Sequence, residues 1–210
     1  MRPAKILTAL VLMTAACGRG HRGSPPPAPQ PDEAARSALS TLSRLVTSDN
    51  YKALGFDTAD EAKSATLQTP LPMRNVPLDA LKAFKPTADP RDLLAEPVES
   101  LYPVAVNGEV RTGLTIQKGK DGFSPSGFGN FDMVRRVARY RQSTGGGGEV
   151  VVRIPAMNLT FLGRTLDNQL FLVPVVADPG YGWKEGQALP AARVFGQLAP
   201  LAANFDHLPI

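Results

Sequence analysis

Hydrophobic residues recur at helical spacing in the first half of the chain. Leu39, Leu42 and Val46 lie three or four residues apart, which places their side chains on one face of a helix. We therefore predict an amphipathic helix over residues 33–48. Helix-start patterns, among them a capping box at Thr58-Ala59-Asp60-Glu61 in which Glu61 reaches back, predict three shorter helical segments after it, over residues 58–67, 77–84 and 89–94.

The pattern then changes to the alternation that is typical of β-strands. Residues 101–106 form a strand-like apolar run, and residues 110–117 place Val110, Thr112, Leu114 and Ile116 on one face; the two segments lie on either side of Asn107-Gly108. Both residues of this pair tolerate positive φ, and the pair favours a two-residue type I′ turn. The sequence therefore predicts a β-hairpin here, and residues 123–128 are predicted to form a third strand.

One further helix is predicted between two groups of strands. Asn130 can cap a helix that runs to about residue 142, with Val134 and Val137 on its buried face. Strands are predicted over 149–154, 159–166 and 170–176, and a last short helix over 191–201. This order predicts an α+β fold, in which N-terminal helices precede an antiparallel β-sheet with one helix packed on it.

The N-terminal residues have the pattern of an export signal. Arg2 and Lys5 are followed by an uncharged run of 11 residues at 6–16, which is shorter than the roughly 20 that span a bilayer. Thr14-Ala15-Ala16-Cys17 resembles the lipobox of bacterial lipoproteins, although Thr14 stands where that family usually has Leu. The resemblance implies a signal peptide at residues 1–16 and fatty acyl chains, such as palmitate, on Cys17.

The same resemblance implies a membrane location. Gly18 stands where an Asp would signal retention in the inner membrane, which implies an outer-membrane anchor facing the periplasm. The alternative is an ordinary signal peptide with Cys17 as a chance thiol. Cys17 is the only Cys, so it has no intramolecular disulfide partner. Residues 17–31 are rich in Gly and Pro and predict a tether, and residues 32–210 predict one globular domain.

Composition excludes several classes of function. Removal of the signal peptide takes away Arg2 and Lys5 and lowers the net charge from +4 to +2, without the basic excess of a nucleic-acid binder. A lipidated Cys17 leaves no free thiol for a cysteine nucleophile or a thiolate metal site. No HExxH, GxSxG or P-loop spacing occurs, so we predict neither a metal nor a cofactor.

Catalysis has one candidate residue. The chain has two His, and His21 lies in the predicted tether, so a Ser-His-acid mechanism would need His207 near the C-terminus. Chain ends fray, which suits a positioned base poorly. We therefore predict a non-enzymatic module that binds an envelope protein or glycan, assists assembly or inhibits a partner. The alternative is an envelope hydrolase that uses His207.

Two groups of residues are candidates for binding. Arg135 and Arg139 lie one helical turn apart and could recognise an anionic partner, such as a lipid headgroup or an acidic protein. The alternative is that they form the solvated face of an amphipathic helix. Tyr181 and Trp183 occupy a Gly-rich turn, where exposed rings could stack on a sugar or a partner protein. The alternative for Trp183 is a half-buried position against a sheet edge.

Overall fold

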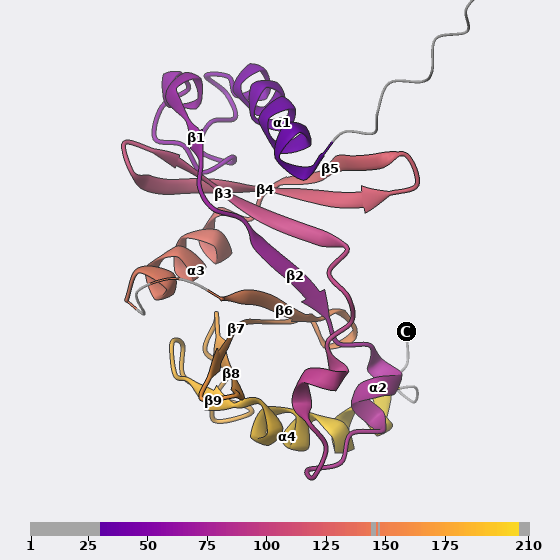
Figure 1. Ribbon diagram of the computed structural model, residues 1–210. Coiled ribbons are helices and arrows are strands. Elements are labelled where there is room, and N and C mark those ends of the chain that lie inside the picture. The colour runs from indigo at the N-terminus through magenta and orange to yellow at the C-terminus, as the bar shows by residue number, and fades with distance from the viewer. Residues whose placement is uncertain (1–29, 144–145, 147, 206–210) are drawn as a thin grey trace, which may run out of the picture.

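The computed structural model describes residues 30–143, 146 and 148–205. These residues form an α+β fold with four α-helices and a nine-stranded, mostly antiparallel sheet (Figure 1). The predicted fold class is therefore confirmed. Cys17, the predicted signal peptide before it, His21 and His207 lie outside the described residues, so the predictions made for them remain predictions.

The element bounds are as follows. The α-helices are α1 (Pro31–Leu45), α2 (Leu78–Lys82), α3 (Phe131–Ser143) and α4 (Ala191–Ala203), and the 3₁₀ helices are η1 (Asp60–Ser64), η2 (Pro90–Leu93) and η3 (Pro155–Met157). The strands are β1 (Thr66–Leu67), β2 (Leu71–Asn75), β3 (Glu99–Val106), β4 (Glu109–Gly119), β5 (Gly122–Gly129), β6 (Val150–Ile154), β7 (Leu159–Leu166), β8 (Gln169–Pro174) and β9 (Leu189–Pro190). The sheet order is β5-β4-β3-β2-β6-β7-β8-β9, and β1 pairs with β3.

The strands β3, β4 and β5 form a layer between two helices (Figure 1). On one face, Ala35, Ala38 and Leu42 of α1 are buried in a cluster with Val104 and Leu114. On the other face, α3 packs against the sheet through its own buried apolar stripe. Small side chains on α1 let the helix lie close to the strands, and β3 in the middle of the layer is buried over most of its length.

The second half of the sheet has its own core. Strands β6 to β9 form an antiparallel meander, whose apolar residues pack with Phe195 and Leu198 of α4 and Leu81 of α2. The two halves are joined by β2, which pairs antiparallel with β3 and parallel with β6. One strand therefore belongs to both halves of the sheet and makes it continuous.

The hairpin predicted at Asn107-Gly108 is confirmed. Val106 pairs with Glu109, and the two turn residues have φ of 51° and 84°.

Replacing Gly108 by Val should lower the free energy of unfolding by about 1 kcal/mol or more, because a β-branched residue resists positive φ. Urea unfolding of the two full-length proteins measures the difference, and equal midpoints would contradict it.

The helix predicted over residues 58–67 is only partly present. The 3₁₀ helix η1 ends at Ser64, and Thr66 and Leu67 pair with Ala105 and Val104 of β3 instead. The Glu61 carboxylate accepts a hydrogen bond of 2.8 Å from the amide of Asp57, one residue before the predicted capping box. Strand pairing thus stops the helix after little more than one turn.

Candidate binding site: an arginine groove beside α3

Helix α3 lies close to the sheet because the strand beneath it is glycine at the point of contact. Val134, Val137 and Ala138 form its buried face. A β-carbon built on Gly113 of β4 would lie 2.7 Å from Cγ2 of Val134. This close approach fixes α3 over β4. The arginines of α3 then lie beside the apolar face that packs on the sheet.

A groove of about 570 Å³ runs between α3 and the β3–β4 hairpin. Its lining residues are Gly108, Glu109, Val110, Arg111, Asp132, Arg135, Arg136, Ala138, Arg139 and Gln142. The structure therefore places both predicted binding arginines, Arg135 and Arg139, in one groove. Four guanidinium groups and two carboxylates line it, and the contacts of each decide how much charge is left for a ligand.

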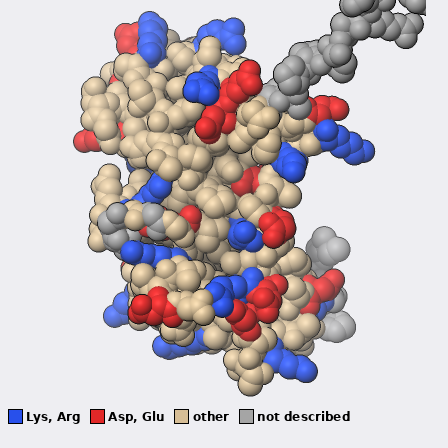
Figure 2. Space-filling model, in the orientation of Figure 1, with Lys and Arg blue, Asp and Glu red and all other residues tan. Residues whose placement is uncertain are grey.

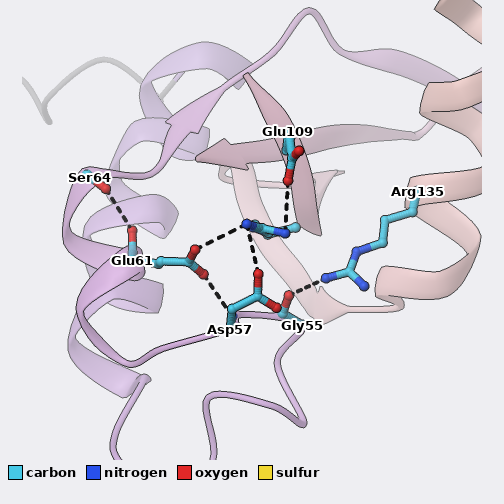
Figure 3. Close-up of polar contacts among 7 residues, drawn as sticks. Gly55, Asp57, Glu61, Ser64, Glu109 and Arg135 are labelled. Carbon is cyan, nitrogen blue, oxygen red and sulfur yellow. Dashed lines mark hydrogen bonds and ion pairs between the residues drawn. The ribbon is translucent and has the colours of Figure 1, made fainter. Parts of the chain in front are cut away.

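Arg111 is held by three carboxylates (Figure 3). Its Nη2 lies 2.8 Å from Asp57 and 3.2 Å from Glu61, and its Nη1 lies 3.2 Å from Glu109. The Asp57 amide, which donates to Glu61, and the nearby Arg111 guanidinium lower the pKa of Glu61. Because the three acids outnumber this one cation, Arg111 contributes no net positive charge to the groove.

Arg135 ties α3 to the loop before η1. Its Nη2 donates a hydrogen bond of 2.6 Å to the carbonyl of Gly55, and its guanidinium lies 5.4 Å from the centre of the Phe131 ring (Figure 3). Neither contact is to a carboxylate, so the positive charge of Arg135 is not neutralised by an ion pair among the described residues. Its side chain is fixed at one nitrogen and keeps donors for a ligand.

Arg136 and Arg139 share one acid. Arg136 Nη1 makes a short contact with Glu185 Oε2, whereas Arg139 Nη2 lies 3.9 Å from the other oxygen, beyond hydrogen-bond distance. The Arg139 side chain is 70% exposed. Arg136 is therefore an anchor for α3, and Arg139 is the guanidinium of the groove that is most available to a ligand.

The remaining arginine of the helix, Arg141, is also a structural contact. Its Nη1 donates to the carbonyl of Thr69 at 2.8 Å, and its Nε lies 3.6 Å from the buried carboxylate of Glu149. The arginines of α3 therefore differ in role, although they look alike in the sequence. The solvated face that was the alternative interpretation describes Arg139 but not Arg135, Arg136 or Arg141.

The prediction that Trp183 is an exposed stacking residue is wrong. Trp183 is 4% exposed, its ring lies against Phe161 with centroids 5.4 Å apart, and its Nε1 donates to Gln197 of α4 at 2.9 Å. The Tyr181 ring stacks on the Trp183 ring, with centroids 4.4 Å apart. The ring is drawn inside because α4 supplies both an apolar pocket and an acceptor for the indole N–H. Trp183 is therefore part of the core, and the partly buried Tyr181 packs against it.

Metal sites and membrane-spanning helices were sought in the described part of the chain. Within it, no group of three or more His, Cys, Asp and Glu side chains could hold a metal ion. None of the helices of that part is long and apolar enough to cross a membrane.

Several residues in and around the groove were not predicted from the sequence. Arg111, Gly55 and Glu185 come from three separate segments and meet at α3 only in the folded protein. The one local signal was Glu61, whose place at a helix start suggested a capping role rather than a partner for Arg111. An arginine at every turn of one helix indicates charge, but not which guanidinium groups are already paired.

Comparisons with known proteins give no assignment. No protein-family model matches the chain, and neither a curated protein nor a solved structure is significantly similar to it.

Proposed function

We propose that this chain is a bacterial lipoprotein, anchored through Cys17 in the outer membrane, whose domain binds a partner rather than catalysing a reaction. The groove beside α3 would receive an anionic group of that partner, such as a carboxylate of an envelope protein. The observation that supports this most strongly is the exposure of Arg139. Its guanidinium is largely exposed in a groove whose other wall is the β3–β4 hairpin.

The charge distribution supports a local contact rather than a broad electrostatic surface. Basic and acidic side chains are interspersed over the face shown in Figure 2. Within the groove, Arg111 and Arg136 are paired with acids, while Arg135 and Arg139 keep donors that can hold a carboxylate. Such a site fits one or two anionic groups of a partner better than a polyanion.

The groove favours binding over turnover. A general acid–base mechanism needs two groups placed on either side of a reacting bond. Of the two acids that line the groove, Glu109 is engaged by Arg111 at 3.2 Å, which leaves Asp132 alone. Guanidinium groups hold a ligand but do not exchange protons at ordinary pH.

The test uses a photocrosslinking residue in place of Gln142, which lines the groove, in cells that make the full-length protein. Arg139→Glu should reduce crosslinking to the partner by at least about tenfold, because a charge-assisted hydrogen bond is lost and repulsion is added. Arg193→Glu makes the same change of charge on an exposed position of α4 and should leave crosslinking unchanged. Crosslinking should also weaken as salt is raised.

Two results would contradict the proposal. One is equal crosslinking in the Arg139→Glu and Arg193→Glu proteins. The other is loss of cellular function in His207→Ala cells that contain normal amounts of folded protein, since this would favour the hydrolase.

A further inference from the structure

A second groove lies at the N-terminal end of α3 and shares no lining residue with the arginine groove. It consists of two adjoining cavities of about 380 and 200 Å³, which have Asn130, Met133 and Thr160 in common. The larger cavity reaches Trp183, and the smaller one reaches the face of β4 and β5. We call it the amide groove.

The smaller cavity exists because the sheet has glycines there, among them Gly127. Leu101, Thr115 and Gly127 are paired across β3, β4 and β5, so they form one row on the α3 face of the sheet. A β-carbon built on Gly127 would meet no atom within 4 Å. The row thus ends in open space beside the start of α3. A larger residue in place of Gly127 would fill this space.

Four neutral polar side chains surround the groove without partners of their own. They are Asn130, Asn158, Thr115 and Thr160, and none of their side chains makes a hydrogen bond within the described residues. The two amides each offer a donor and an acceptor, and so do the two hydroxyls. Ligands with several hydroxyl groups match such a set.

The groove has no unpaired cation among its described lining residues. Arg153 is its one basic side chain; it contacts the Glu99 carboxylate and donates through Nε to Asn75 at 3.1 Å. The one acidic side chain, Asp178, accepts a hydrogen bond of 3.0 Å from the amide of Gly180. An anionic ligand would find no counter-charge here, which favours a neutral one.

The other lining side chains are mostly apolar. Met133 stands at the junction of the two cavities, and Val176, which is 62% exposed, lines the larger one in front of the buried Trp183. Apolar walls with a few convergent polar groups are typical of sites that bind small organic ligands. Strand β7, which contributes Thr160, is paired on both edges with β6 and β8, so a peptide cannot add to it as a further strand, whereas β5, which lines the smaller cavity, is an edge strand.

We propose that the amide groove is a binding site for a neutral saccharide. Its hydroxyl groups would bond to the amides of Asn130 and Asn158 and to the threonine hydroxyls, while the C–H faces of the sugar ring pack on Met133 and Val176. This proposal is independent of the anionic partner proposed for the arginine groove.

The test titrates the full-length protein with maltotetraose and with chitotetraose, in a zwitterionic detergent that has no sugar headgroup. The side-chain amide signals of Asn130 and Asn158 should shift in NMR spectra with at least one of the two sugars. Asn130→Gly with Asn158→Gly should weaken that binding by at least about tenfold, since glycine keeps the positive φ of both positions but lacks the amide.

Two further variants separate the groove from general effects. Asn107→Gly removes another asparagine at positive φ, which is not among the residues that line the groove, and should change affinity less than about twofold. Gly127→Val should abolish binding without lowering the melting temperature, because its side chain enters open space. Arg139→Glu should leave sugar binding unchanged, which distinguishes this site from the arginine groove.

Three outcomes would overturn the proposal. The first is no saturable shift with either sugar up to about 10 mM, a concentration that reveals even weak sites. The second is equal binding by the wild-type and Gly127→Val proteins. The third is displacement of the sugar by a neutral alanine-serine peptide that binds tighter, which would assign the groove to a polypeptide.

Discussion

Replacing Cys17 by Ser should move the protein from the membrane fraction to the soluble fraction. The expected effect is large because the proposed anchor depends on this one sulfur. Each buried CH₂ of an acyl chain contributes about 0.8 kcal/mol, so two chains anchor a protein stably whereas one binds only marginally. Serine cannot form the thioether, and no other Cys is present to replace it. Fractionation of cells and mass spectrometry of the N-terminal peptide measure the change.

The matched control is Thr14→Leu. It restores the residue that bacterial lipoproteins usually carry at that position, so maturation and membrane association should be retained. A Cys17→Ser protein that matures normally and stays with the membrane would contradict the lipid anchor. The result would then favour an ordinary signal peptide with Cys17 as a chance thiol.

The parts of the fold that could be predicted from the sequence are those in which local and long-range preferences agree. At Asn107-Gly108, positive φ at both residues suits the turn, and the strand-forming residues on each side supply the pairing. In α3, the apolar residues that favour a helix also face the sheet. Where the two kinds of preference conflict, as after Ser64, strand pairing decided the outcome.

The candidate site was predictable only in part, for a physical reason. Helical spacing shows that Arg135 and Arg139 share a side of α3, and both do line one groove. Their difference depends on Gly55 and Glu185, which lie about 50 to 80 residues away in the chain. The burial of Trp183 likewise depends on residues distant in the chain, Gln197 and Phe161. No local pattern encodes these distant partners.

Replacing Gly55 by Ala should be the most damaging small substitution beside the arginine groove. Gly55 has φ of 90°, and an added β-carbon would lie 2.5 Å from the carbonyl oxygen of Arg111 and 2.7 Å from Cβ of Phe131. Positive φ alone costs of order 1–3 kcal/mol for other residues, and here backbone atoms must also move. We expect the free energy of unfolding to fall by about 3 kcal/mol, measured by urea unfolding with the fluorescence of Trp183, the only Trp.

Gly108→Ala is the matched control for this substitution. Gly108 has a similar φ of 84°, but a β-carbon there would meet no atom within 4 Å, so its cost is that of the backbone conformation alone, about 1 kcal/mol. The difference between the two variants therefore measures the crowding of Gly55 between β4 and α3. Because the Gly55 carbonyl accepts from Arg135, displacement of this loop should also weaken crosslinking through the arginine groove. Equal losses of stability in the two alanine variants would show that the loop yields freely and that Arg135 is not held by it.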